Sequence, residues 1–512
     1  EYKDENGKDI LGEIYEYLIG KFAANAGKKG GEFYTPHEVS QILAKIVTGN
    51  IQSQTDTFTV YDPTMGSGSL LLTVRNELPD GSRQGAVSFY GQELNTVTYN
   101  LARMNLMMHG VTYNNMTLNN ADTLESDWPD GPDRDGIDRP RSFDAVVANP
   151  PYSAKWDNNE SKLKDPRFSE YGKLAPASKA DYAFILHSLY HLNNEGTMAI
   201  VLPHGVLFRG AAEGKIRQTI IEKNYLDAVI GLPANLFYGT GIPACILVLD
   251  KEDTADRTGI FMIDASKGYV KDGNKNRLRE QDIHKIVTTF LTMDESDPKY
   301  ARFVPNEEIK VTNEYNLNIP RYIDSSEPED LQDINAHLNS GIPEIDVDSM
   351  AEYWAVYPSL KEILFQPLRP GYLRPAVGKD EAVSTITSHP EFIRHADQVD
   401  DAYTRWKKTV THDLMQLGRD IHPKELIAKI SEQLLDDFAQ VSLLDKYDVY
   451  EVLMEYWAET MQDDVYAVCY DGYEAGREIA YEYVTKKKKE NGQTIEVKTD
   501  KIKGFEGKLL PK

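Results

Sequence analysis

Cysteine is almost absent from this sequence. Among 512 residues only Cys245 and Cys469 occur, and they form no CxxC pair and lie near no cluster of histidines. This scarcity argues against a disulfide framework and against a structural zinc site. The sequence also has no run of about 18 apolar residues, the length that a membrane helix requires, and it opens with no signal peptide. We therefore predict a cytoplasmic protein with no metal site and no membrane segment.

Positive charge is scarce as well. The chain has 56 Lys and Arg against 81 Asp and Glu, a formal net charge of −25. An acidic surface opposes binding to nucleic acid, because contacts with phosphate depend on Lys and Arg. If the protein acts on nucleic acid, either a basic partner provides most of the binding or a local basic face is masked by acidic regions elsewhere. We favour the partner.

The hydrophobic pattern divides the chain into three parts. Residues 1–30 predict a helical segment, and because the first residue is Glu1 rather than Met we expect the sequence to be a fragment. Residues 31–325 contain short apolar runs that alternate with helical stretches, which predicts an α/β domain with a mainly parallel sheet. Residues 326–512 predict a mostly helical region without strands, and it ends in a lysine-rich tail. The expected strands are 58–61, 87–90, 116–118, 143–148, 198–202, 226–231 and 244–249.

Two polar segments flank the fourth expected strand. Residues 125–141 are rich in Asp, Gly and Pro, and they predict a loop insertion. Residues 158–179 follow the same strand and predict a mobile flap over a site at its end. The lysine run at 486–489 is interpreted as a solvated part of the tail, although it could contact DNA.

A glycine turn follows the first expected strand. Residues 62–68 read Asp-Pro-Thr-Met-Gly-Ser-Gly and lead into a helical stretch. Glycine has no Cβ, so the backbone of such a turn can approach a nucleotide-like ligand closely. The spacing matches neither the dinucleotide motif GxGxxG nor a P-loop, so both of these sites are the weaker interpretation.

Polar residues also follow the next three expected strands. Glu93, Asp122 and Asn149 are separated from Asp62 and from one another by 31, 29 and 27 residues, about one βα unit each. In a parallel sheet these positions emerge side by side at the carboxyl edge, where ligands bind. Glu93 is placed to accept both ribose hydroxyls of an adenosine, and Asp122 to accept from its adenine amino group.

The fourth strand ends in Asn149-Pro150-Pro151-Tyr152. Pro151 stiffens the loop and has no N–H, so the Pro150 carbonyl stays available beside the Asn149 side-chain oxygen. Two such acceptors can hold both hydrogens of an NH₂ group and localise the nitrogen lone pair toward an electrophilic methyl group. The Tyr152 ring can stack on a base that has been removed from the duplex. This chemistry uses positioning and electrostatics, with no covalent intermediate and no metal.

This ordered set of motifs resembles the DNA amino-methyltransferases. They carry the Asp-Pro-x-x-Gly-Ser-Gly loop, the Asn-Pro-Pro-Tyr motif and an upstream Phe-x-Thr-Pro element, here residues 33–36. The resemblance implies a Rossmann-like fold, S-adenosylmethionine as cofactor and N6 methylation of a flipped-out adenine. It also implies that the upstream element meets the methionine end of the cofactor, with Thr35 at its carboxylate. The expected catalytic residues are Asn149, Pro150, Pro151 and Tyr152, and the expected cofactor-binding residues are Glu32, Phe33, Tyr34, Thr35, Pro36, His37, Asp62, Thr64, Met65, Gly66, Ser67, Gly68, Glu93 and Asp122.

More narrowly, the chain resembles the modification subunits of type I restriction–modification systems. The similar stretches are 31–36, 99–105, 178–184 and 217–233. Met65 stands where that family often has Ala. The resemblance implies an assembly on double-stranded DNA of two modification subunits and one specificity subunit, to which a separate restriction and motor subunit is added. Those subunits normally begin with a larger helical domain, of which residues 1–30 would be a remnant.

Two other functions remain open. Asn-Pro-Pro-Tyr also occurs in enzymes that methylate a glutamine amide on a protein, and a scaffold subunit could bind the cofactor without turnover. Several further residues fit either a ligand contact or ordinary packing. They are Asp181, Tyr182, His204, Phe208, Phe237 and Tyr238.

Overall fold

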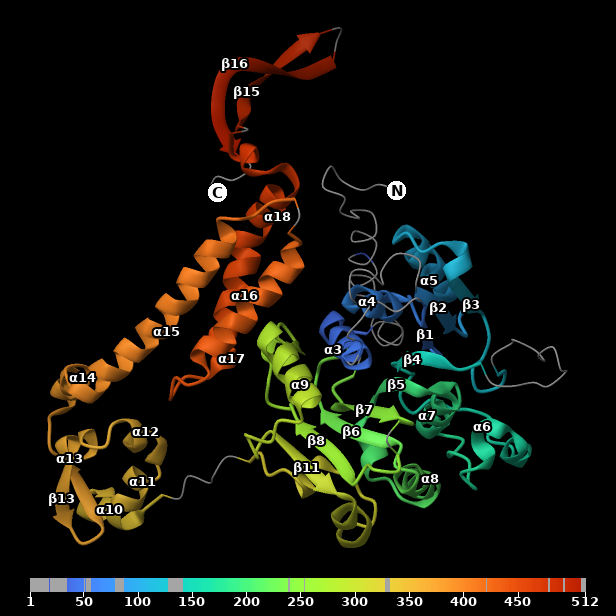
Figure 1. The fold of residues 1–512 in the computed structure, drawn as a ribbon, viewed down its shortest axis with the longest axis horizontal. Coiled ribbons are helices and arrows are strands. Elements are labelled where there is room, and N and C mark those ends of the chain that lie inside the picture. Colours follow the sequence, from blue (N-terminus) through green and yellow to red (C-terminus); the bar gives the residue numbers. More distant parts are fainter. Residues whose placement is uncertain are drawn as a thin grey trace. The chain divides into compact units, whose positions relative to one another are not determined.

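The structure is a computed structural model that describes most of the chain (Figure 1). The described residues are 18, 35–49, 51, 57–78, 87–127, 141–237, 240–252, 254–326, 332–419, 421–477, 479–490 and 493–507. The chain forms two compact units, residues 1–326 and 327–512. Apart from Leu18, the helical segment expected over 1–30 lies outside the described residues.

A nine-stranded sheet organises the first unit, in the order β11-β8-β6-β7-β5-β4-β1-β2-β3. Strand β7 runs antiparallel to β5 and β6, and β11 runs antiparallel to β8, whereas the other pairs are parallel. The predicted mainly parallel sheet is therefore confirmed, and each expected strand is present. The strands are β1 (Phe58–Asp62), β2 (Val87–Gln92), β3 (Met116–Asn119), β4 (Phe143–Ala148), β5 (Leu192–Pro203), β6 (Leu226–Gly231), β7 (Ala244–Asp250), β8 (Gly259–Asp264) and β11 (Ala301–Pro305).

Helices cover both faces of this sheet, because apolar side chains point to both faces along its central strands. In β4, Ala145 and Val147 join one core cluster, whereas Val146 and Ala148 join the other. The first face carries α3 (His37–Thr48), α4 (Ser69–Glu77), α5 (Thr96–Met108) and α9 (Glu280–Thr292). The second carries α6 (Pro166–Ser169), α7 (Asp181–Tyr190) and α8 (Ala211–Glu222).

Short elements complete the first unit. They are η2 (Tyr113–Asn115), η3 (Glu160–Lys164), η4 (His204–Leu207), η5 (Glu308–Thr312), η6 (Ile319–Arg321) and the hairpin of β9 (Val270–Asp272) with β10 (Lys275–Arg277). Within the loop insertion predicted over 125–141, residues 128–140 lie outside the described part of the chain.

The segment over 158–179 differs from the mobile flap that we expected. Arg167 and Phe168 are buried, and Tyr171 and Ala175 belong to the core of the second face. The backbone amide of Trp156 donates to the carbonyl of Ala177, which closes the segment at its base. The expectation was wrong because the polar composition of the segment hides a few apolar residues that anchor it to the core.

Helices dominate the second unit, and α15 to α18 pack around one apolar core. The helices are α10 (Ile334–Asn339), α11 (Glu344–Asp348), α12 (Ala351–Val356), α13 (Leu360–Leu364), α14 (Lys379–Thr387), α15 (Pro390–Leu414), α16 (Pro423–Phe438), α17 (Lys446–Tyr456), η7 (Trp457–Met461), α18 (Gln462–Asp471) and η8 (Tyr473–Arg477). Across the described parts of both units, no helix combines the length and the apolar character that a bilayer crossing demands.

The second unit also contains strands, which corrects the expectation that none follows Tyr322. A small sheet has the order β12-β14-β13, from Ile342–Pro343, Tyr372–Pro375 and Phe365–Arg369. A long hairpin pairs β15 (Ile479–Glu490) with β16 (Gln493–Gly507). The lysine run at 486–489 lies in β15 rather than in a tail, because backbone pairing does not require the apolar alternation by which strands are recognised in sequence.

A glycine in β8 gives a direct test of this packing. A Cβ at Gly259 would fall closer to the Val304 carbonyl oxygen than side chains are ever found, where β8 pairs with β11. We expect Gly259→Ala to lower the free energy of unfolding by about 1–3 kcal/mol, the usual cost of forcing extra atoms into a packed site. Chemical denaturation measures this change. Gly210→Ala is the control, since nothing lies within 4 Å of a Cβ there; equal losses in both variants would contradict the packing described.

Candidate active site

The carboxyl ends of four adjacent strands define the site. Strands β4, β1, β2 and β3 are neighbours in the sheet and run parallel. Asp62 on β1 is paired with Gly91 on the neighbouring strand β2, two residues before Glu93. Thr123, which follows Asp122, donates its hydroxyl to the carbonyl of Pro63, which follows Asp62. The strand ends are therefore joined by hydrogen bonds as well as by the sheet.

The glycine turn passes directly from β1 into α4. Gly66 and Gly68 have φ of 53° and 75°, in the left-handed region that favours glycine. A Cβ at Gly68 would also lie 2.6 Å from Leu106 Cδ1 on α5. The amide of Met65 donates to the carbonyl of Gln92 at 3.0 Å, which ties the turn to the end of β2. Both glycines are thus required by backbone geometry.

Asp62 carries a buried carboxylate at this turn. It is 2% exposed and accepts from the Thr64 amide at 2.8 Å. Burial removes water from the carboxylate and Glu93 adds negative charge nearby, so the pKa of Asp62 rises from 3.8 to about 7. A cationic group placed beside this buried carboxyl would stabilise its ionised form.

Glu93 turns back onto the glycine turn. Its carboxylate accepts from the Gly66 amide at 3.2 Å and from the Asn95 amide at 2.7 Å. Burial raises the pKa of Glu93 as well. Asp122, one strand further along, accepts from the Leu124 amide at 2.9 Å. The two carboxylates therefore follow adjacent strands; Asp122 is held by an amide of its own loop, and Glu93 by amides of its own loop and of the glycine turn.

Asn149 faces a small cavity beside the turn. Its Nδ2 donates to Thr35 Oγ1 at 3.0 Å, and among the described residues its buried Oδ1 has no hydrogen-bond partner. A buried acceptor without a partner is costly, so a ligand N–H is the partner that this atom lacks. The cavity is lined by Thr35, Asp62, Thr64, Met65, Ser67, Ser69, Leu70 and Asn149.

Asp181 holds the loop that carries the Asn-Pro-Pro-Tyr motif. It is fully buried, and its carboxylate accepts from the Ser153 amide and from Arg209, both at 2.8 Å. Ser153 has φ of 52°, a strained conformation that these contacts maintain. The sequence left open whether Asp181 caps a helix or contacts a ligand. Nothing in the sequence pointed to this third role, because it depends on residues that meet only in the fold.

Tyr152 lies partly buried at the end of this loop. Its ring meets Phe237 edge-on, with the ring centroids 5.8 Å apart. Its hydroxyl is buried and has no partner within the described chain, and burial raises the pKa of the phenol well above 10. Tyr152 is therefore neutral at physiological pH and presents an aromatic surface rather than a charge.

The remaining candidates are placed as follows. Glu32, Phe33 and Tyr34 lie outside the described residues, and Pro36 and His37 begin α3. His204, after β5, has a buried Nε2 without a partner among the residues described, and burial lowers its pKa. Tyr182 donates its hydroxyl to Val206 and packs in the core. Phe208 is 48% exposed, Phe237 is buried, and Tyr238 lies outside the described residues.

Comparisons with known proteins find similar methylase subunits. The family model for N-6 DNA Methylase matches residues 6–331. The type I restriction enzyme MpnII methylase subunit of Mycoplasma pneumoniae is 42% identical over 345 residues, which cover 67% of this chain and 62% of that protein. The HindI methylase subunit of Haemophilus influenzae is 33% identical over 332 residues, covering 63% of this chain and 70% of that protein. The chain thus spans about two thirds of the length of these relatives.

A solved structure shows the same fold. The crystal structure of the type I restriction-modification system methyltransferase subunit from Streptococcus thermophilus is 50% identical, with a TM-score of 0.57. The match covers 62% of this chain and 64% of that one. The mixed, mainly parallel sheet with helices on both faces is that of the S-adenosylmethionine-dependent methyltransferases.

The raised pKa of Asp62 predicts how stability depends on pH. The folded chain holds this proton up to about pH 7, whereas the unfolded chain loses it near 3.8. The stability that the group contributes is therefore complete below pH 4 and is lost as the pH rises through 7. In the wild type the free energy of unfolding should fall by up to ~4 kcal/mol between pH 4 and pH 8 because of this group. Asp62→Asn should not show this part of the fall. Denaturation of the ligand-free protein from pH 4 to 8 measures this.

Asp272→Asn, at an exposed position of β9, is the control for this experiment and should leave the pH profile unchanged. If the free energy of unfolding of Asp62→Asn depends on pH in the same way as that of the wild type, the pKa of Asp62 is not raised by burial.

Proposed function

The chain belongs to the N-6 DNA methylase family, and we propose that it transfers a methyl group from S-adenosylmethionine to the N6 amino group of adenine in double-stranded DNA. The observation that carries this proposal is the Asn149 side chain. Its nitrogen is engaged by Thr35, and its oxygen is buried without a partner among the described residues, beside the cavity that also contains Asp62. An amino group that enters this cavity meets a fixed, unsatisfied acceptor.

The residues of the turn fit the cofactor in charge and in shape. When bound, S-adenosylmethionine supplies an electrophilic methyl group on a sulfonium. Asp62 provides a buried carboxyl group whose ionised form a cationic ligand would stabilise, and the Gly66–Gly68 backbone leaves room for close approach. Glu93 would exchange its amide contacts for the ribose hydroxyls, and Asp122 would accept from the adenine amino group. The rest of the proposed cofactor set is Glu32, Phe33, Tyr34, Thr35, Pro36, His37, Thr64, Met65, Ser67 and Gly68.

The Asn149 loop activates the target amino group by holding both of its hydrogens. Asn149 Oδ1 accepts one hydrogen and the Pro150 carbonyl the other, which withdraws the nitrogen lone pair from the purine ring. Pro151 keeps the loop stiff, and Asp181 fixes its far end through Ser153. Tyr152 offers a neutral ring on which the everted base can stack. Each of these contributions is a matter of position, so no covalent intermediate is needed.

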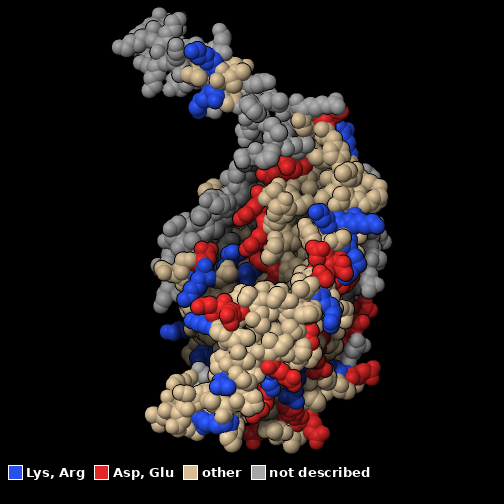
Figure 2. All heavy atoms as spheres, turned by 90° about the vertical axis from the view of Figure 1, so that its left-hand side faces the viewer, with Lys and Arg blue, Asp and Glu red and all other residues tan. Residues whose placement is uncertain are grey.

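Charge favours an assembly in which another subunit supplies most of the DNA contacts. The net charge is −25, and on the face that Figure 2 shows the described Lys and Arg residues are interspersed with Asp and Glu. We propose a type I complex in a bacterial or archaeal cytoplasm, with a second copy of this chain, a specificity subunit and a restriction and motor subunit. Residues 31–325 would be the catalytic domain, and 326–512 would contact a partner or DNA.

Methylation of a glutamine amide on a protein is the rival activity with the same motif. The upstream Phe-Tyr-Thr-Pro element and the long C-terminal unit fit the DNA enzyme better, and the curated relatives described above are type I methylase subunits. A scaffold that binds the cofactor without turnover is disfavoured by the intact Asn149 loop.

The substrate is tested with labelled S-adenosylmethionine. We expect the chain, mixed with its specificity subunit, to place label on adenine N6 in DNA and none on a release-factor-like protein. The isolated chain should methylate DNA far less efficiently at physiological salt, because its own surface is acidic. Nucleoside analysis of the digested DNA identifies the product. Label on the protein alone would establish the rival activity, and efficient specific methylation by the isolated chain would refute the dependence on a partner.

The mechanism is tested by Asn149→Ala. Loss of the acceptor should reduce the methylation rate by about 10³-fold or more, as removal of a preorganised electrostatic contact does. The affinity for S-adenosylmethionine should change little, because the proposed partner of Asn149 is the target base and not the cofactor. Rates and calorimetric binding are measured on the same preparation. Asn193→Ala, which removes an asparagine bound to Asp144 near the start of β5, is the matched control. A normal methylation rate in Asn149→Ala would contradict the proposed mechanism.

A further inference from the structure

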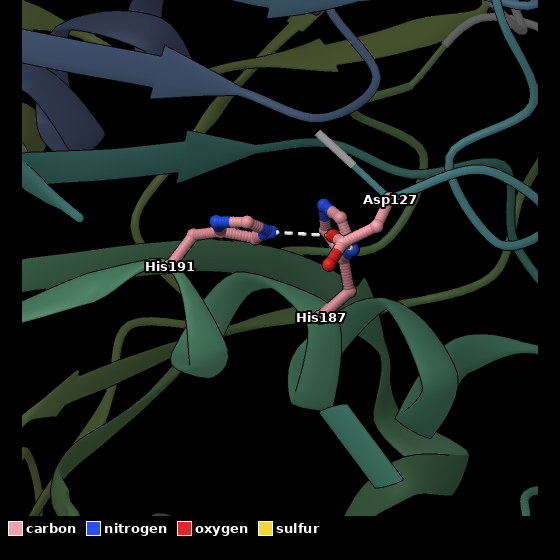
Figure 3. A group of neighbouring side chains, drawn as sticks. All are labelled: Asp127, His187 and His191. Carbon is pink, nitrogen blue, oxygen red and sulfur yellow. Dashed lines mark hydrogen bonds and ion pairs between the residues drawn. The ribbon is translucent and has the colours of Figure 1, made fainter. Parts of the chain in front are cut away.

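A polar cluster joins two buried histidines to the exposed Asp127 (Figure 3). His187 on α7 and His191 just after it are 0% and 1% exposed, and both rings lie beside Asp127. The three side chains offer ligand atoms within 4.8 Å of one another, which is a spacing that could hold a metal ion.

Arg167 supplies the positive charge in this cluster. It is 3% exposed, and its Nη1 lies 3.1 Å from His187 Nδ1 while its Nε lies 3.9 Å from Asp127 Oδ1. Its guanidinium is held by Asp165 through contacts of 2.6 to 3.1 Å. A metal ion on His187 Nδ1 would sit against this buried cation and would be repelled by it. The cluster is better described as a hydrogen-bond network around Arg167 than as a metal site.

The hydrogen bonds of this network all run in one direction, from donor to acceptor, starting at Arg167. Arginine can only donate, so His187 Nδ1 must accept. The neutral ring then donates from Nε2 to the Tyr61 hydroxyl at 2.8 Å, and burial, which lowers the pKa of His187, agrees with a neutral ring. Tyr61 in turn donates to Gln92 Oε1 at 2.7 Å. Each hydrogen bond fixes the donor and acceptor roles of the next.

The ends of this network meet the segments that carry the proposed cofactor residues. Tyr61 directly precedes Asp62, and Gln92 directly precedes Glu93. Arg167 Nη1 also donates to the carbonyl of Thr123 at 2.8 Å, and Thr123 directly follows Asp122. One buried network thus reaches the neighbours of all three carboxylates, which stand at or after the ends of β1, β2 and β3. Its origin, Arg167, lies on α6, which follows the Asn149 loop in the chain.

We infer that Arg167 and His187 are positioning residues that set the spacing of Asp62, Glu93 and Asp122 for the cofactor. This inference rests on the proposed function, since it assumes that these carboxylates bind S-adenosylmethionine. Neither residue lines the cavity at Asn149. Loss of the network should therefore weaken cofactor binding while it leaves the chemistry of the bound complex nearly intact.

Calorimetric titration of the full chain with S-adenosylmethionine tests the inference. His187→Leu and Tyr61→Phe break the network, and each should weaken the affinity by about tenfold. His187→Gln keeps one donor and one acceptor and should stay within about threefold of the wild type. In the complex with its specificity subunit, KM for the cofactor should rise and kcat should change little. Tyr61→Phe removes a single hydroxyl and keeps the ring, so it can be measured even if His187→Leu does not fold.

Arg217→Met is the matched control. Arg217 is also a buried arginine, and it donates to the carbonyls of Val206, Arg209 and Tyr315, none of which belongs to the network or to the proposed cofactor set. Its loss should lower the midpoint of thermal unfolding yet leave the cofactor affinity unchanged. Equal weakening in Arg217→Met, or wild-type affinity in both His187→Leu and Tyr61→Phe, would overturn the inference. So would stoichiometric zinc in the purified protein that His187→Leu abolishes.

Failure of the proposed function gives a different result. If the wild-type chain binds no S-adenosylmethionine at all, both the function and the inference fall. If the wild type binds it and the network variants bind it equally well, only the inference falls.

Discussion

Parallel pairing of β4, β1, β2 and β3 is the constraint on which the site depends. Each parallel strand delivers its carboxyl end to the same edge, so residues that are about 30 positions apart in the chain become neighbours there. The arrangement is possible because both faces of these strands are apolar and are covered by helices. Asp62 is the last residue of β1, and Glu93, Asp122 and Asn149 follow the ends of β2, β3 and β4.

The site keeps polar groups in a state that the fold alone would not favour. Asp62 is buried near another carboxylate, and Asn149 Oδ1 is buried without a partner in the described chain. Both features cost stability, and both would be relieved by a ligand that brings positive charge and N–H donors. This is the usual relation between stability and function: a preorganised site is held in its binding geometry by the surrounding structure before the ligand arrives.

The segment after the Asn149 loop supports this preorganisation. It anchors itself by Phe168 in the core and by Arg167 in the buried network, while Asp181 fixes the loop from α7. The strand ends that carry Asp62, Glu93 and Asp122 and the loop after Asn149 therefore share a common support on one face of the sheet. The second unit has its own core and a long hairpin, and it is built without any of these residues.

The α/β architecture, the order of the strands along the chain and the polar residues at the strand ends could all be predicted from the sequence. These depend on local periodicity and on motifs such as residues 62–68, which short stretches of chain specify. The folded structure was needed to see that 158–179 is anchored, that the 486–489 run lies in a hairpin and that Asp181, Arg167 and His187 form buried hydrogen bonds near the strand ends. Those outcomes depend on contacts between residues distant in sequence, because burial and hydrogen-bond partners are properties of the folded chain rather than of any one segment.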